Sequence, residues 1–353
     1  MSKKNIGVIF GGVSSEHEVS KLSAKTVLSN IDYEKFNVYP IFITKDGEWR
    51  FFEGNLEDVA SENPEVFSKS KAIISPDRKD RGILKITEDN KIEKINIDAV
   101  FPVLHGKFGE DGTIQGLFAL AGIPYAGSGV VGSGVCMDKC MAKILFEKAG
   151  INQAKWVELK KCDELDAKTV EEKLGYPVFV KPSAAGSSVG VTKANNEAEL
   201  KAAVELAFEH DYKVLIEEAI NAREVEISLK GNLEPVCSPC AGEILPAKEF
   251  YDFEAKYQDE SSKLMLPAPI SEETLNKIKD NAIRAYKICE CRGFARVDFF
   301  VEKTTGEIYL NEINTLPGFT DISMYPKLWS FADLSIKDLI TELIEIAILR
   351  DDE

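Results

Sequence analysis

Near the C-terminus, two pairs of polar side chains could act together on one ligand. Arg296 and Asp298 stand two residues apart in one largely apolar run. Glu312 and Asn314 have the same spacing in the next run. Because residues two apart share one face of a β-strand, each pair would point the same way. The intervening Thr304-Thr305-Gly306 predicts a three-residue hairpin loop, since glycine suits its left-handed third position.

The register of this predicted hairpin brings the two pairs together. A three-residue loop places Lys303 opposite Glu307. The same register places Asp298 opposite Glu312 and Arg296 opposite Asn314. The Cβ atoms of each opposed pair would be roughly 5 Å apart. Two carboxylates and one amide oxygen suit Mg²⁺ that is held jointly with phosphates. A surface ladder of charges is the alternative, but such a ladder would usually alternate in sign.

Composition narrows the class of protein. A chain of 353 residues predicts two or three domains, and 44% hydrophobic with 29% charged residues is ordinary for a soluble enzyme. The formal net charge of −16 argues against nucleic acid as a partner, because backbone binding needs a basic surface. No apolar run approaches roughly 18 residues, and the residues after Met1 lead into a short strand instead of a signal peptide. We expect a cytoplasmic protein with no membrane partner.

Cysteine usage favours reduced thiols. The chain has seven cysteines, an odd number, and only three histidines. Cys237 and Cys240 form a C-x-x-C pair, but no second pair follows at the spacing of a zinc ribbon. A redox or zinc role is the less favoured alternative.

The order of strands and helices predicts an α/β protein. Strand, loop and helix alternate through the first part of the chain, as in a doubly wound domain. Ser15 and Glu18 predict a capping box at the first helix. The stretch 46–94 is polar and irregular, and we assign it small strands, loops and no function. Strands are expected at 6–10, 38–43, 100–104, 176–181, 214–218, 224–229 and 295–310. One helix is expected to begin near residue 15, and a second to follow the segment 105–112 and end near 120. Further helices are expected at 132–149, 197–208, 272–290 and 336–349.

A small-residue loop at 183–190 could cradle phosphates. It follows Lys181 directly and contains glycines and serines, so backbone N–H groups and hydroxyls could approach an anion closely. It is not a Walker A loop, because G-x-x-x-x-G-K-[ST] is absent from the chain. A flexible surface turn is the alternative.

A second glycine-rich segment, 127–132, matches the dinucleotide fingerprint G-x-G-x-x-G. The fingerprint needs a strand before it and an acidic residue at the end of a second strand about twenty positions later. Here the preceding Ile123-Pro124-Tyr125 is short and broken by proline, and Glu147 falls in a helical pattern. A nicotinamide-dependent oxidoreductase is therefore less favoured.

Two residues at strand-to-helix crevices could contact a ligand. Glu16 is placed to hold a cationic group, although a carboxylate in a first helical turn is also favoured electrostatically. His105 follows a strand and precedes a glycine, and a core or capping histidine is its alternative. The aromatic segment 250–257 reads as a long loop of the kind that closes over active sites.

The chain resembles the D-alanine–D-alanine ligases of the ATP-grasp superfamily over nearly its whole length. These bacterial enzymes supply the dipeptide end of peptidoglycan precursors. Five blocks in order carry the resemblance: Gly-Gly-x-Ser-x-Glu-x-Glu-Val-Ser at 11–20, His-Gly-x-x-Gly-Glu-Asp-Gly at 105–112, Val-Lys-Pro-Ser with Gly-Ser-Ser-Val-Gly at 180–190, Tyr-Asp-Phe-Glu-Ala-Lys-Tyr at 251–257, and Arg-Val-Asp with Glu-Ile-Asn-Thr-Leu-Pro-Gly-Phe-Thr at 296–320.

The resemblance implies a three-domain ATP-grasp fold and a set of site residues. The implied units are an N-terminal Rossmann-like domain at 1–127, a central subdomain at 128–217 and a C-terminal subdomain at 218–353. ATP would be bound by Lys139, Lys181, Ser187, Ser188, Glu217, Glu218, Ile220, Glu224 and Lys256. Two Mg²⁺ or Mn²⁺ ions would be held by Asp298, Glu312 and Asn314. D-Alanine would be bound by Glu16, His105, Tyr251, Arg296, Gly318, Ser323 and Met324, and catalysis would use Glu16, Ser187, Tyr257, Arg296 and Gly318.

The implied chemistry joins two D-alanines in two steps. ATP phosphorylates the first carboxylate, and the amine of the second D-alanine attacks the acyl phosphate, with Arg296 and the Gly318 N–H facing the oxyanion. D-Serine-using relatives commonly carry arginine where Met324 stands, so D-alanine is favoured and a D-alanine–D-serine ligase is the alternative. Glu218 stands where some relatives carry lysine, which leaves the adenine contacts open there. A homodimer is also implied.

Overall fold

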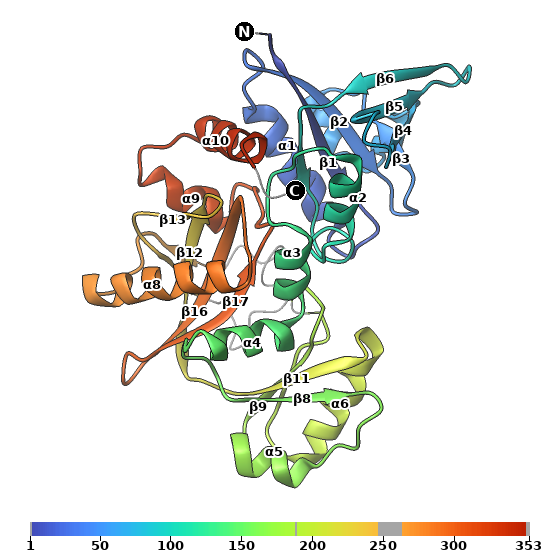
Figure 1. Ribbon diagram of the computed structural model, residues 1–353. Helices are drawn as coiled ribbons and strands as arrows, with labels where there is room; N and C mark the ends of the chain where they lie inside the picture. Colours follow the sequence, from blue (N-terminus) through green and yellow to red (C-terminus); the bar gives the residue numbers. More distant parts are fainter. Residues whose placement is uncertain (1, 188, 246–262, 351–353) are drawn as a thin grey trace.

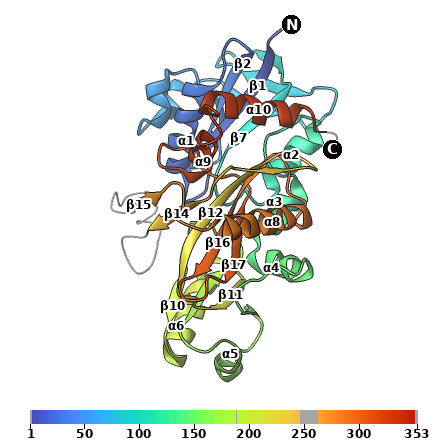
Figure 2. The same cartoon turned by 90° about the vertical axis from the view of Figure 1, so that its left-hand side faces the viewer.

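Three β-sheets divide the protein along its long axis. The computed structural model describes residues 2–187, 189–245 and 263–350. The N-terminal sheet lies at one end, a small sheet at 156–218 at the other, and the C-terminal sheet between them (Figure 1). The same order of units is visible after a quarter turn (Figure 2). The predicted mixed α/β fold is confirmed.

The N-terminal sheet has a parallel part and an antiparallel extension. The strand order is β6-β5-β4-β3-β2-β1-β7, and β1 pairs in parallel with both neighbours. β1 is buried along most of its length because it lies in the interior of this sheet. The stretch 46–94 supplies the extension. The bounds are β1 Lys4–Gly11, α1 His17–Asn30, β2 Phe36–Ile43, β3 Trp49–Phe51, η1 Leu56–Ala60, η2 Pro64–Phe67, β4 Lys71–Ile74, β5 Gly82–Ile86, β6 Ile92–Asn96, β7 Ala99–Val103 and α2 Thr113–Ala121.

The predicted capping box at the first helix is wrong. α1 begins at His17, and Ser14 supplies the polar contact at its start by accepting the Glu16 N–H at 3.1 Å. Glu18 instead forms ion pairs with Lys21 and Lys45, at 2.7 and 2.8 Å. The lysine partners compete with the backbone for the carboxylate, so the local capping pattern does not form.

The predicted helix 132–149 is two helices. α3 Val130–Met137 ends at Asp138, and α4 Lys139–Lys148 begins directly after it. Asp138 has extended backbone angles and accepts the Met141 N–H through its side chain at 3.1 Å. It is therefore the N-cap of α4. The apolar periodicity continues across this residue, so the sequence pattern does not reveal the break between the two helices.

The small sheet has its own helices and core. The strand order is β10-β9-β11-β8, all antiparallel. Inward-facing aliphatic residues of β9 and β11 pack with α5 and α6. The bounds are β8 Trp156–Lys160, α5 Ala167–Leu174, β9 Val178–Pro182, β10 Thr192–Ala194, α6 Glu197–His210 and β11 Lys213–Glu218.

The C-terminal sheet has the order β15-β14-β12-β16-β17, with β13 also paired to β12. α8 packs on it through one apolar face and is capped by Ser271, which accepts the Thr274 N–H. α10 leaves this unit and packs into the N-terminal core. The bounds are β12 Ala222–Lys230, β13 Val236–Cys237, β14 Gly242–Leu245, β15 Lys263–Met265, α8 Glu272–Ile288, β16 Phe294–Glu302, β17 Ile308–Asn314, α9 Met324–Ser330 and α10 Ile336–Ile348.

The hairpin of β16 and β17 has the predicted inner register but a different turn. Asp298 lies opposite Glu312, as predicted, and Arg296 lies opposite Asn314. At the turn, however, the Glu302 N–H donates to the carbonyl of Glu307, so Lys303 does not face Glu307. A register shift after Asp298, where Asn311 has no ladder partner, makes up the difference.

None of the helices among the described residues combines the length and apolar character needed to cross a membrane. All seven cysteines are free thiols, as the composition predicts.

Candidate active site

The face of the C-terminal sheet carries a buried ion-pair network. Arg296 donates from Nε and Nη2 to the two carboxylate oxygens of Asp298, both at 2.7 Å, and its Nε lies 3.0 Å from Glu226. Burial would lower the pKa of the Arg296 guanidinium, but Asp298 and Glu226 raise it well above its ordinary value. A permanently charged, rigid guanidinium can therefore face an anion here.

Sequence reasoning missed Glu226. It lies opposite Asp298 on β12, which is the other neighbour of β16. The signal was present, because Glu224 and Glu226 stand two residues apart in a strand that was itself predicted.

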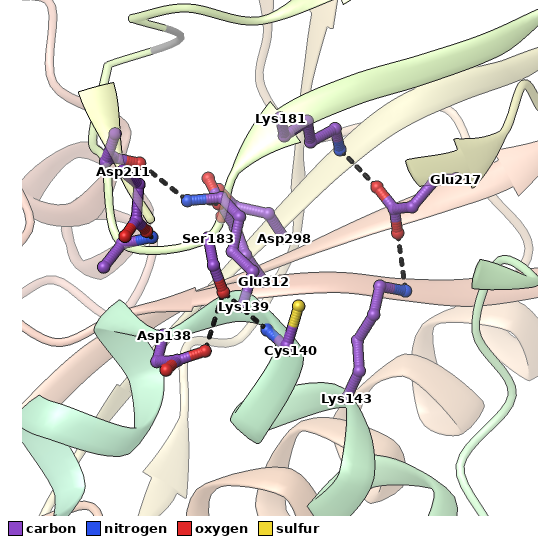
Figure 3. Close-up of polar contacts among 12 residues, drawn as sticks. Asp138, Lys139, Cys140, Lys143, Lys181, Ser183, Asp211, Glu217, Asp298 and Glu312 are labelled. Atoms are coloured by element: carbon purple, nitrogen blue, oxygen red, sulfur yellow. Dashed lines mark hydrogen bonds and ion pairs between the residues drawn. The ribbon is translucent and has the colours of Figure 1, made fainter. Parts of the chain in front are cut away.

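Lys139 connects this face to the small-residue loop. Its Nζ lies 3.6 Å from Glu312 and donates to the carbonyl of Ala185 at 2.8 Å. Asn314, the third predicted metal ligand, accepts the Leu316 N–H through its side-chain oxygen at 3.1 Å. The first residue of α4, the β17 strand and the loop at 183–190 therefore meet in one place (Figure 3).

A second buried network surrounds Glu217. Its two carboxylate oxygens accept from Lys181 and Lys143, each at 2.5 Å (Figure 3). Burial would raise the pKa of Glu217, but the two lysines outweigh it and lower the pKa to about 2. Lys143 was also missed from the sequence, because it lies on α4 and its pairing depends on where that helix packs.

The remaining predicted nucleotide contacts lie on or near β11 and β12. Glu218 accepts the Lys155 N–H at 2.8 Å and lies 3.9 Å from the Lys155 ammonium. Ile220 follows in the half-buried connection, and Glu224 is on β12 opposite Phe300. These residues lie along the segment of chain that leads from β11 into β12.

Glu16 and Ser187 meet although 171 positions separate them in sequence. The Ser187 hydroxyl donates to the carboxylate of Glu16, a residue that is 6% exposed. Gly106 has a left-handed backbone, and a Cβ there would lie 2.5 Å from the same carboxylate. The bare glycine thus leaves the space that Glu16 occupies.

His105 lies beside Glu16 and links to the C-terminal loop. Burial lowers the pKa of its imidazole below the ordinary 6.5, against the opposing effect of Glu16. Its Nε2 lies 3.3 Å from the Ser23 hydroxyl, and that hydroxyl accepts the Phe319 N–H at 3.2 Å. Ser23, which sequence reasoning did not single out, therefore joins the N-terminal crevice to the residue after Gly318.

The predicted second-substrate residues lie at the start of α9, with Ser323 directly before the helix and Met324 as its first residue. The Ser323 hydroxyl accepts the Thr320 N–H at 2.9 Å, and a Cβ on Gly318 would lie 2.9 Å from it. The Met324 side chain is buried in a small apolar cluster with Ile244 and Leu328. Four further predicted site residues, Ser188, Tyr251, Lys256 and Tyr257, lie outside the described residues.

The donor set of the predicted metal site fits a phosphate-shared Mg²⁺. No three Asp, Glu, His or Cys side chains within 2–187, 189–245 and 263–350 gather closely enough to hold a metal by themselves. The predicted set has only two carboxylates, Asp298 and Glu312, and one amide, Asn314. Mg²⁺ is usually bound by one or two carboxylates with substrate phosphates, so this oxygen set suits it.

Comparisons with known proteins cover nearly the whole chain. Residues 5–128 match the family model described as the D-ala D-ala ligase N-terminus, and residues 145–345 match that of the C-terminus. The D-alanine–D-alanine ligase of Acetivibrio thermocellus is 51% identical over 99% of this chain and 96% of its own length. The crystal structure of VanG D-Ala:D-Ser ligase from Enterococcus faecalis has a TM-score of 0.90 at 43% identity, covering 98% of this chain and 100% of that one. The D-alanine–D-alanine ligase from Coxiella burnetii has a TM-score of 0.84 at 33% identity, covering 98% and 95%.

Proposed function

This chain belongs to the D-alanine–D-alanine ligase family, and we propose that it joins two molecules of D-alanine at the expense of ATP, through a D-alanyl phosphate. The likeness to solved D-alanine ligase structures supports the ATP-grasp fold, and the three-unit division stays a prediction. The product would serve peptidoglycan precursor synthesis.

One observation carries the assignment of the site. The loop at 183–190 contacts both a residue proposed to bind ATP and one proposed to bind the amino acid. Ala185 accepts from Lys139, and Ser187 donates to Glu16. A lysine suits the phosphates of ATP, and a buried carboxylate suits the ammonium of an amino acid. This arrangement supports transfer of phosphate from ATP to an amino acid held by Glu16.

The residues around the loop account for each chemical requirement. A free carboxylate is a poor electrophile, so its oxygen must first attack the γ-phosphorus of ATP while ADP leaves. Lys139 and Lys181 would neutralise the phosphates, and phosphoryl transfer depends mainly on such positioning and electrostatics. The amine of the second D-alanine then forms the new C–N bond while phosphate leaves. Arg296 and the Gly318 N–H would stabilise the oxyanion in this step.

We include Mg²⁺ or Mn²⁺ in the proposal, two ions held by Asp298, Glu312 and Asn314. Bound there, the metal would supply charge neutralisation at the phosphates. Tyr257 and Lys256 stay a prediction as parts of a lid over the site.

The decisive experiment is product analysis. We expect ADP and phosphate to be released only when ATP, Mg²⁺ and D-alanine are all present, and the product to be D-alanyl-D-alanine in the presence of equal D-serine or D-lactate. The similarity to VanG means that the fold does not by itself distinguish the second substrate, whereas the relatives at about half identity are named D-alanine–D-alanine ligases. A product that contains more D-alanyl-D-serine than D-alanyl-D-alanine would contradict the assignment.

A homodimer and a cytoplasmic location complete the proposal, supported by the family resemblance. Light scattering on the purified protein should give the mass of two chains, and a monomer at working concentration would contradict this part.

A further inference from the structure

Helix α4 is joined to strand β11 by two ion pairs of opposite sense. At the start of the helix, Asp138 accepts from the ammonium of Lys213. Further along, Lys143 donates to Glu217 at 2.5 Å. The helix thus contributes one anion and one cation, and the strand contributes the two complementary charges. Two such pairs of reversed sign fix the helix in one register against the strand.

The first pair is mostly buried, more so at the lysine than at the aspartate. The side chain of Lys213 is 7% exposed and that of Asp138 is 21% exposed. Burial would raise the pKa of the Asp138 carboxyl, but Lys213, the Ser183 hydroxyl and the Met141 N–H lower it. A buried ion pair contributes little to stability compared with apolar residues of the same volume, yet removing one partner leaves an unpaired buried charge. Its presence here is better explained by the geometry that it imposes.

That geometry includes Ser183, the first residue of the small-residue loop at 183–190. The Ser183 hydroxyl donates to Asp138 at 2.7 Å and accepts the Cys140 N–H at 3.2 Å (Figure 3). The Ser183 backbone accepts the Lys139 N–H and donates to the carbonyl of Lys213, both at 2.9 Å. The first residue of the loop is therefore held on all sides by the two residues of the ion pair and their chain neighbours.

The ion pair also crosses between two cores. On α4, Ala142 and Phe146 pack into the core of the C-terminal sheet. On β11, Val214 and Ile216 pack into the core of the small sheet. Lys139 belongs to the first of these bodies. Lys181, on β9, belongs to the second. The spacing of the two lysines thus depends on how the bodies are held together.

We propose that the Asp138–Lys213 ion pair positions Lys139 and Lys181 relative to each other, so that both reach the phosphates of one ATP molecule. Asp138 and Lys213 are positioning residues, because their contacts are to other protein groups. The proposal rests on the proposed function only in naming ATP as the ligand.

The test compares two lysines of similar environment. Lys213→Met removes the cation of the proposed pair. Lys230→Met removes a lysine, 14% exposed in its side chain, that pairs with Glu342 between β12 and α10, away from the loop. Binding of ATP with Mg²⁺ is measured by calorimetry without D-alanine, alongside thermal unfolding and the KM for each substrate.

We expect Lys213→Met to weaken ATP binding and raise the KM for ATP about 10-fold, a size typical of mutations that act through a packed network. The KM for D-alanine should change less than about 2-fold. Lys213→Arg should restore most of the ATP affinity. Lys230→Met should lower the unfolding temperature and leave ATP binding unchanged. Wild-type ATP affinity in Lys213→Met, or equal weakening in Lys230→Met, would overturn the proposal.

Asp138→Asn covers the case in which Lys213→Met does not fold. The amide keeps an oxygen for the Met141 N–H and removes the charge that faces Lys213. It should weaken ATP binding by a similar factor, and unchanged binding would again overturn the proposal. Failure of the proposed function is a separate result, because it would appear in the wild type as ATP binding without D-alanine-dependent ADP release.

Discussion

The N-terminal and C-terminal sheets present their functional residues in different ways. In the N-terminal sheet, Glu16 and His105 follow the ends of the parallel strands β1 and β7. In the C-terminal sheet, Asp298 and Glu312 point from the face of antiparallel strands. A residue at a strand end keeps its place if a helix start is misjudged by one or two positions, whereas a residue on a face moves to the opposite side with each single shift of register.

The hairpin shows how narrow that dependence is. Its loop is one residue longer than predicted, because Glu302 pairs with Glu307. A uniform ladder continued from that turn would direct Glu312 towards the core. The irregularity at Asn311 restores the pairing of Asp298 with Glu312 and leaves Leu310 and Ile313 both buried. The predicted site was correct here because two deviations cancel.

The largest expected effect tests the face of the hairpin. Glu312→Gln removes one of two carboxylates near the phosphate site and should lower kcat at least about 1000-fold, since charge on the transferring phosphoryl group is then poorly neutralised. Steady-state ADP release at saturating Mg²⁺ measures this. Glu307→Gln, at the exposed turn directly before the same strand, is the control and should keep wild-type kcat. Full activity of Glu312→Gln would show that this face does not bind the metal.

A conservative change tests whether geometry or charge matters on the same face. Arg296→Lys keeps the positive charge and loses the planar fork that holds Asp298 at 2.7 Å through two nitrogens. We expect kcat to fall about 100-fold, the size seen when one oxyanion donor is lost. The control is Arg223→Lys, because Arg223 forms a similar fork with Glu243 in the same sheet. Equal kcat in the two variants would place the oxyanion elsewhere.

The elements that could be predicted are those whose evidence is local. The strands β1, β2, β7 and β11 and the helices α6, α8 and α10 follow from apolar runs or periodicity bounded by polar residues. The break at Asp138 was missed because its N-cap role leaves the apolar pattern uninterrupted. Lys143 was missed for a different reason, since its partner Glu217 lies on another element and only packing brings the two together.

The N-terminal crevice is tested by two glutamates of one helix start. Glu16→Gln replaces a charge-assisted contact to the substrate ammonium with a neutral one, and the KM for D-alanine should rise about 10-fold or more. Glu18→Gln is the matched control, because Glu18 pairs with Lys21 and Lys45 and its side chain is 59% exposed. Initial rates at varied D-alanine decide between them. If the two variants raise the KM equally, the crevice does not hold the first substrate.

The smallest effect concerns acid stability and compares Glu18 of the N-terminal unit with Glu217 of the small sheet. Burial raises and lysine partners lower the pKa of both Glu217 and Glu18, and both reach about 2. Because a folded-state pKa below the ordinary 4.5 means stabilisation by the ionised form, this contribution is complete above pH 4.5 and is lost as the pH falls towards 2. For the buried Glu217 it amounts to on the order of 3 kcal/mol.

Lys143→Met removes one partner, raises the pKa of Glu217 part of the way back, and should flatten the fall in unfolding free energy between pH 5 and 3. Lys45→Met removes an exposed partner of Glu18 and should leave the slope as in the wild type, because solvent screens that pair. Denaturant titrations at pH 6, 5, 4 and 3 measure both slopes. An equal flattening in the two variants would mean that the buried Glu217 pair contributes no more to acid stability than the exposed Glu18 pair.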